Sequence, residues 1–289
     1  MIQDILVTGL VNGGVYALLA VGFSLIFGVA RIVNIAHTAF YMLAAYCFYM
    51  LLVKVGLGFA LSGVIAVAAV TLLSVACYWL VIEPVREHEA AVLIATIALA
   101  LVFQELMLFA FGGHYLGIPS TLDGVASVAG VSIPYQRLLI LVVAALMLVA
   151  TWALLYRTRL GLAIRATAND IEVASLMGMN VNRVAMATVA ISVALAAIAG
   201  VVVAPVFVVD PFMWLSPLVT MLAIVVLGGL GSLKGSLIGA LIIGYVEAIT
   251  VFALPAGAFL KGAVALSIMV LVLLVRPEGL YGVAFEEER

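Results

Sequence analysis

Long, nearly uncharged apolar stretches alternate with short polar ones along almost the whole chain. An α-helix needs about 20 apolar residues to cross the hydrocarbon core of a bilayer, and each stretch is of about that length. The nine stretches occupy residues 5–30, 32–53, 55–82, 90–112, 138–156, 184–209, 211–233, 235–254 and a last run that ends at Val275. The pattern predicts an all-α, polytopic membrane helix bundle with eight or nine transmembrane segments.

Some of these segments are expected to be broken or re-entrant rather than continuous. Asp210 and Pro211 separate two apolar stretches, and Pro217 and a glycine cluster at 228–231 fall within the next one. Irregular backbone at membrane depth is tolerated where it is buried in protein or lines a wet cavity. We expect residues 1–289 to form a single transmembrane domain.

Composition excludes most other classes of protein. Hydrophobic residues make up 67% of the chain and charged residues 9%, against roughly 45–50% and roughly 25% in soluble domains. The net charge of −2 offers no basic excess for nucleic acid. Cys47 and Cys77 both lie in apolar runs, so neither a disulfide scaffold nor a metal site is expected.

Enzymatic motifs are also missing from the sequence. The glycine-rich stretch 228–236 reads GGLGSLKGS, which lacks the Gly-Lys-Ser/Thr order of a phosphate-binding P-loop and has a lysine where the dinucleotide motif needs its third glycine. We therefore expect no catalytic residues and no cofactor bound by this chain.

The distribution of lysine and arginine predicts the orientation, because cytoplasmic loops of membrane proteins carry an excess of these residues. With nine crossings, one side holds Arg31, Arg86, Arg157, Arg159, Arg165, Arg183, Lys234, Arg276 and Arg289, and the other holds Lys54, Arg137 and Lys261. The bias predicts a cytoplasmic C-terminus and an N-terminus on the outer side.

Five polar side chains within the apolar stretches are candidates for a substrate path: Asn34, His37, Thr38, Glu105 and Glu247. A charge inside a membrane costs about 2.5–3.5 kcal/mol on insertion scales, so each glutamate should face the bundle or a wet cavity, or be protonated. Each glutamate could line the substrate path, couple transport to protons or form a buried hydrogen bond between helices, and the sequence leaves these three roles open. If Asn34, His37 and Thr38 lie on one helix, they share a face; the alternative is a capping Asn34 and a packing His37.

Three glycines spaced by four residues, Gly231, Gly235 and Gly239, would line one face of a helix. A face without side chains lets another helix approach closely. We interpret it as a packing seam, either within a translocation core or as ordinary helix packing.

The polar segment 157–183 predicts a short helix on the cytoplasmic side. Asn169 and Glu172 have the spacing of a capping box, and Gly178 is a helix terminator. Ile171, Ala174 and Met177 would then form an apolar strip. Such a strip needs a protein partner or lies on the membrane surface; we favour the protein partner.

This segment resembles the cytoplasmic coupling loop of ABC importer permeases. Residues 172–178 (EVASLMG) are similar to its Glu-Ala-Ala-x-x-x-Gly core, although Val173 departs from the second position. The wider chain resembles the branched-chain amino acid (LivH-type) permease family at 12–14 (NGG), 16–18 (YAL), 34–37 (NIAH), 161–166 (GLAIRA), 174–180 (ASLMGMN), 196–200 (AAIAG), 226–232 (VLGGLGS) and 276–280 (RPEGL).

The resemblance implies a non-catalytic permease domain in the bacterial inner membrane that imports branched-chain amino acids or related small polar solutes by alternating access. It also implies a second homologous permease subunit, two ATP-binding subunits that carry ATP and Mg, and a periplasmic substrate-binding protein. The coupling residues would be Arg165, Ile171, Glu172, Ala174, Met177 and Gly178. The family also includes transporters of urea, amides and aromatic acids.

Two other functions stay open on the residues alone. An ion- or proton-coupled secondary transporter would use Glu105 or Glu247 as its carrier. A passive channel would need neither ATP nor a proton gradient.

Overall fold

The computed structural model describes residues 2–119, 124–128 and 131–282. Its main elements are α1 (Ile2–Ala30), α2 (His37–Tyr49), α3 (Phe59–Cys77), α4 (Glu89–Phe111), β1 (Val125–Val128), β2 (Val131–Pro134), α5 (Tyr135–Arg157), α6 (Arg159–Asn169), α7 (Ile171–Leu176), α8 (Val181–Val203), α9 (Leu215–Gly228), α10 (Leu233–Ala253) and α11 (Gly257–Val275). Short π-helical turns continue α2 (Met50–Lys54) and α3 (Tyr78–Ile82), and a 3₁₀ turn (Glu83–Val85) follows.

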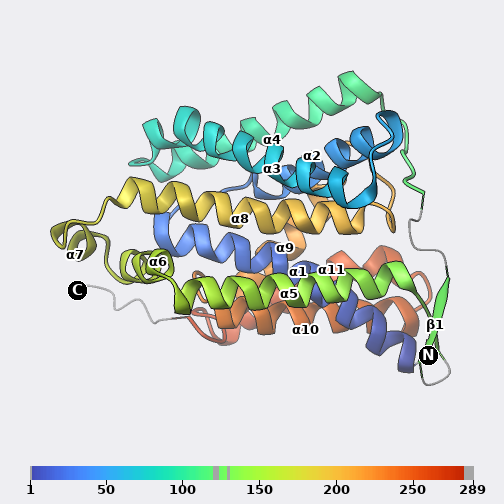
Figure 1. Cartoon of the computed structure of the whole chain (residues 1–289). Coiled ribbons are helices and arrows are strands. Elements are labelled where there is room, and N and C mark those ends of the chain that lie inside the picture. The colour runs from blue at the N-terminus through green and yellow to red at the C-terminus, as the bar shows by residue number, and fades with distance from the viewer. Residues whose placement is uncertain (1, 120–123, 129–130, 283–289) are drawn as a thin grey trace.

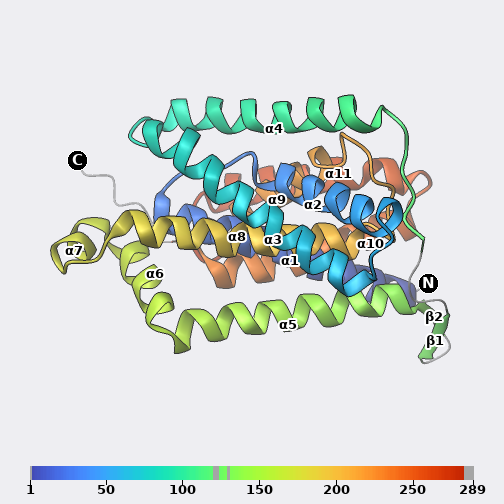
Figure 2. The same cartoon turned by 45° about the horizontal axis from the view of Figure 1, so that its top comes forward.

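The long helices run side by side along one direction, so the bundle has two ends (Figures 1 and 2). The short helix α7 projects from one end, which we call the α7 end. The start of α1 and the antiparallel β1–β2 hairpin lie at the opposite end, the hairpin end. Apolar helices of this length satisfy every backbone hydrogen bond internally, as a membrane span requires.

Seven helices in the described part of the chain are long and apolar enough to cross a membrane. The all-α, polytopic fold class is therefore confirmed, whereas the count of eight or nine spans is not. The difference lies at two apolar stretches of the sequence: α2 has 13 helical residues before it turns π-helical, and α9 has 14. Residues 205–214, which precede α9, are not helical.

The core of the bundle is built around α1 and α8. In the most apolar part of α1, 72% of the residues are buried, and in that of α8, 67%. The corresponding share in α11, at the periphery, is 6%. Helix α1 packs against α8, α10, α5 and α9. Because the two central helices reach from one end of the bundle to the other (Figure 2), any site near their middle is enclosed by helices.

Glycines allow close approach of the helices, but the three glycines expected on one helix face do not all lie on it. Gly235 and Gly239 of α10 face the backbone of α9, where an added Cβ at Gly239 would lie 2.8 Å from the Ile224 carbonyl oxygen. Gly231 precedes α10 and has φ +80°, so it lies in a turn, and its place on a common helix face was a wrong prediction. The spacing of four misled because α10 begins only at Leu233.

Candidate functional site

A cavity of about 360 Å³ lies among α1, α2, α5, α8, α9 and α11 and is the main candidate for the site. Apolar side chains form most of its wall. Its full lining is Val11, Asn12, Val15, Tyr16, Leu19, Tyr41, Ile140, Val203, Phe207, Val208, Asp210, Met213, Ser216, Pro217 and Lys261. Such a volume is typical of small-molecule sites.

The cavity belongs to the hairpin-end half of the bundle. Asn12 and Tyr16 come from the first half of α1, and Lys261 from the first turns of α11, whose preceding helix α10 ends at Ala253. The non-helical segment 205–214 supplies Phe207, Val208 and Asp210. Backbone hydrogen bonds in both directions between Leu116 and Val209, each 3.0 Å, tie this segment to the chain that follows α4.

Glu247 lies behind the cavity wall rather than in it. The side chain is 1% exposed. The Tyr16 hydroxyl donates to Glu247 Oε2 at 2.7 Å, and Thr220 Oγ1 donates to Oε1 at 3.4 Å. These bonds join α1, α9 and α10, and because Tyr16 itself lines the cavity, Glu247 holds one wall of it in place.

Asn34, His37 and Thr38 are all buried and do not line the cavity. Asn34 lies in the turn before α2, so the shared helix face expected from their spacing does not form. The Phe23 ring of α1 meets the His37 ring edge-on, with centroids 6.2 Å apart. Among the described residues Asn34 Oδ1, both His37 ring nitrogens and Thr38 Oγ1 have no hydrogen-bond partner. The three residues thus form a buried polar cluster, which we call the His37 cluster.

Glu105 is exposed on α4, so of the expected placements it does not take the one that faces the bundle. Its neighbour Gln104 points inward, where Trp214 Nε1 donates to Gln104 Oε1 at 3.0 Å. Gln104 Nε2 in turn donates to Glu105 Oε1 at 3.3 Å. Two adjacent positions on a helix point about 100° apart, so only one of this polar pair reaches the interior.

The segment 157–183 forms two helices where the sequence predicted one. Thr158 caps α6, and Asp170, not Asn169, caps α7 by accepting from the Val173 amide at 3.0 Å. Asn169 is the last residue of α6. Gly178 has φ +81°, which suits the helix end expected there.

The apolar face of α7 also differs from the predicted strip. Ala174 is buried within the chain and Ile171 is half-buried, so neither is free for a partner. The exposed apolar side chains are Val173, Leu176 and Met177, and Leu176 is 87% exposed. Met177 therefore belongs to an exposed apolar surface formed by these three residues, the α7 surface, and Glu172 is exposed beside it.

Arg165 is held by its own chain. Its Nε donates to the Leu155 carbonyl at 3.1 Å, and its guanidinium lies 4.7 Å from the centre of the Tyr156 ring. Both contacts fix α6 against the end of α5, so the visible role of Arg165 is to orient the segment that carries α7.

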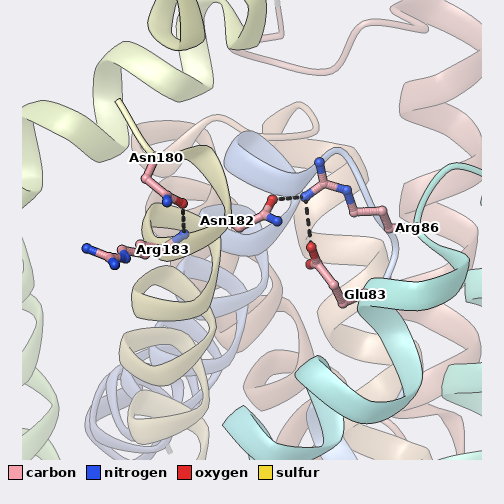
Figure 3. A network of polar contacts seen from close by, with 5 residues as sticks. All are labelled: Glu83, Arg86, Asn180, Asn182 and Arg183. Carbon is pink, nitrogen blue, oxygen red and sulfur yellow. Dashed lines mark hydrogen bonds and ion pairs between the residues drawn. The ribbon is translucent and has the colours of Figure 1, made fainter. Parts of the chain in front are cut away.

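A polar network joins the start of α8 to the turn between α3 and α4 (Figure 3). Arg86 Nη1 donates to Asn182 Oδ1 at 2.5 Å and pairs with Glu83 at 3.5 Å. Beside it, Asn180 caps α8 by accepting from the Arg183 amide at 3.0 Å. The network links two membrane helices at the α7 end, directly after the α7 surface.

Sequence reasoning missed the charged and polar lining of the cavity. Asp210 was visible only as a helix break, and Lys261 only as an outer-side charge. Among the described residues no group of three or more His, Cys, Asp or Glu side chains is placed to hold a metal ion. The chemistry available in the cavity is therefore that of Asn12, Tyr16, Tyr41, Ser216 and the two charges.

Comparison with known proteins gives consistent matches over nearly the full length. The family model "Branched-chain amino acid transport system / permease component" matches residues 5–273. The high-affinity branched-chain amino acid transport system permease protein BraD of Pseudomonas aeruginosa is 32% identical over 96% of this chain and 94% of its own length. The corresponding LivH protein of Escherichia coli K12 is 31% identical over 95% and 93%.

A solved structure supports the fold alone. PsaBC from Streptococcus pneumoniae, in complex with Fab, superposes with a TM-score of 0.54 at 14% sequence identity, covering 95% of this chain and 92% of the other.

Proposed function

Because this chain belongs to the family of branched-chain amino acid transport system permease components, we propose that it is one permease subunit of an ATP-driven (ABC) importer. Its substrates would be branched-chain amino acids or related small polar solutes, moved across the bacterial inner membrane by alternating access. The observation that carries this proposal is the separation of two features: a cavity in one half of the bundle and an exposed apolar helix at the opposite end.

The α7 end is the proposed cytoplasmic side. By the ends of their helices, Arg31, Arg86, Arg157, Arg159, Arg165, Arg183, Lys234 and Arg276 lie there, whereas Lys54, Arg137 and Lys261 lie toward the hairpin end. Arg289 falls outside the described residues. This distribution supports a cytoplasmic C-terminus and an outer N-terminus by the positive-inside rule.

The proposed partners follow from this orientation. A substrate-binding protein would deliver ligand at the hairpin end, and a second homologous permease subunit would complete the path within the lipid bilayer. Two ATP-binding subunits, which would carry ATP and Mg, would dock at the α7 surface. The high exposure of Leu176 and Met177, at 87% and 77%, supports a protein contact there, because large apolar side chains gathered in water mark interaction sites.

The proposed path runs from the cavity toward the His37 cluster. The cluster lies where α2 begins, beyond the deeper part of the cavity wall formed by Leu19 and Tyr41. Its buried polar atoms would offer hydrogen bonds to a substrate that reaches them in an open state. Glu247 would support the wall through Tyr16, and Glu105 is left out of the path because it is exposed on α4.

Coupling would pass through two contacts at the α7 end. Movement of α7 reaches α8 through the short link 177–180, and the Arg86–Asn182 hydrogen bond carries it to the turn between α3 and α4. A docked ATPase shifts the bundle only if its contacts differ between the two states.

Vesicle transport tests the proposal. The assembly would be reconstituted with ATP inside, and leucine-loaded binding protein outside. We expect uptake that requires ATP and persists when a protonophore collapses the proton gradient. Uptake without ATP that stops with the protonophore would instead indicate a secondary transporter, and uptake that needs neither would indicate a channel.

A further inference from the structure

Two opposite charges from different elements face the same cavity without pairing. Asp210 belongs to the segment before α9, and Lys261 to α11. Asp210 Oδ1 accepts from the Phe212 amide at 2.9 Å, which fixes the carboxylate. Within the described ranges Lys261 has neither a hydrogen bond nor an ion pair, and both side chains are half-buried.

The surroundings make these charges unusual. Most of the wall is aliphatic or aromatic, including Val11, Val15, Leu19 and Ile140. A partly desolvated charge beside such a wall is unfavourable unless an opposite charge meets it. Asp210 and Lys261 are the lining residues with full charges, one of each sign.

We infer that Asp210 binds the ammonium group and Lys261 the carboxylate of a zwitterionic α-amino acid, whose aliphatic side chain rests on the apolar wall. The inference rests on the proposed function and narrows its substrate class. A neutral amide or urea would leave both charges unpaired, and an aromatic acid would leave Asp210 unpaired. The neutral groups of Asn12 and Ser216 remain as hydrogen-bonding partners for the ligand.

Thiol protection tests the site without the binding protein, whose own specificity would hide it. Val208 lines the cavity and is 50% exposed, so Val208→Cys, with Cys47→Ala and Cys77→Ala, gives one reporter thiol. Purified assembly would be labelled in the presence of leucine, of 4-methylpentanoate, which lacks the ammonium group, or of 3-methylbutylamine, which lacks the carboxylate.

We expect each variant to lose affinity only for the ligands that carry the charge its substituted residue binds. Leucine protects the reporter at lower concentration than either half-molecule. Asp210→Asn and Lys261→Gln each raise the leucine concentration needed by about tenfold or more, since a hydrogen bond to a charged group is lost. Asp210→Asn spares 4-methylpentanoate and Lys261→Gln spares 3-methylbutylamine, whereas Lys54→Gln, exposed outside the cavity, changes nothing.

Four results would overturn the inference. One is a parent protein that leucine does not protect better than the half-molecules. Another is a pair of variants that respond to leucine as the parent does. The third is equal loss for all three ligands, and the fourth is recovery of leucine protection in the double variant that carries both Asp210→Asn and Lys261→Gln. Either of these two would indicate a structural or gating pair. ATP-driven uptake by the parent is measured separately, so failure of the proposed function is distinguished from failure of this site.

Discussion

His37 combines full burial with two ring nitrogens that have no partner among the described residues. A buried polar group without a hydrogen bond contributes nothing to stability that an apolar group of similar size would not supply. We therefore expect His37 to make its polar contacts in another conformational state of the protein, in which the His37 cluster is accessible to substrate.

We expect His37→Leu to leave the melting temperature of the purified assembly unchanged or higher and to lower ATP-driven leucine uptake several-fold. The Phe23 contact is apolar and survives the change. The melting temperature is measured by intrinsic fluorescence, and transport is measured as leucine uptake into vesicles. Unchanged uptake together with a lower melting temperature would indicate that His37 only packs.

Single residues show where sequence reasoning ends. Glu247 is buried, but its partner Tyr16 is 231 positions away, and nothing in the sequence joins them. Glu105 has the same local pattern and is exposed. Asp210 and Lys261 lie at the ends of apolar runs, where charges are ordinary, so only the fold shows that they share a cavity.

Helices α1 and α10 pack most closely where glycines meet. An added Cβ at Gly244 would lie 2.5 Å from the Gly13 amide nitrogen and 2.8 Å from the Gly9 carbonyl oxygen. Both atoms belong to the backbone, so the helices themselves would have to move apart.

We expect Gly244→Ala to destabilise the chain by about 1–3 kcal/mol through overpacking, seen as a lower melting temperature in detergent. Gly262→Ala is the matched control, because Gly262 also lies within a membrane helix and no heavy atom lies within 4 Å of its added Cβ. Equal melting of the two variants would contradict the close approach of α1 and α10.

Helix ends were predicted less well than helix interiors. The apolar runs located every long helix, because burial and lipid both need uninterrupted apolar surface. The split of 157–183 into α6 and α7 was missed, since Thr158 and Asp170 cap these helices at positions that the expected single helix left unused. The burial of Ala174 and the exposure of Leu176 were also missed, because they depend on how α7 packs against the rest of the chain.

For the whole molecule, the account requires that the two ends of the bundle lie on opposite sides of the membrane. The α7 surface lies at one end, and Tyr115, 78% exposed after α4, lies toward the other. With Cys47 and Cys77 replaced, a cysteine at either position reports its side.

A membrane-impermeant maleimide added to intact spheroplasts should label Tyr115→Cys and leave Leu176→Cys unlabelled until the membrane is opened and the peripheral subunits are stripped from it. The reverse pattern would place the α7 end outside, where no ATP-binding subunit could reach it. Labelling of both cysteines in intact spheroplasts would equally contradict the assigned sides.

The overall architecture was accessible from the sequence because the bilayer leaves few alternatives to helices. The number of complete spans was not, since an apolar run does not reveal where its helix is interrupted. The 211–233 run is apolar enough to span, yet α9 begins only at Leu215, after non-helical backbone that lines the cavity.

The most direct measurement compares ATP hydrolysis and leucine uptake in the same vesicles for two variants of α7. Leu176→Asp places a charge on the α7 surface, and Ser175→Asp places the same charge on the polar side of the same helix. The account predicts that Leu176→Asp lowers uptake about tenfold or more while hydrolysis no longer responds to loaded binding protein, and that Ser175→Asp retains both. Uptake at the parent rate by Leu176→Asp would contradict it.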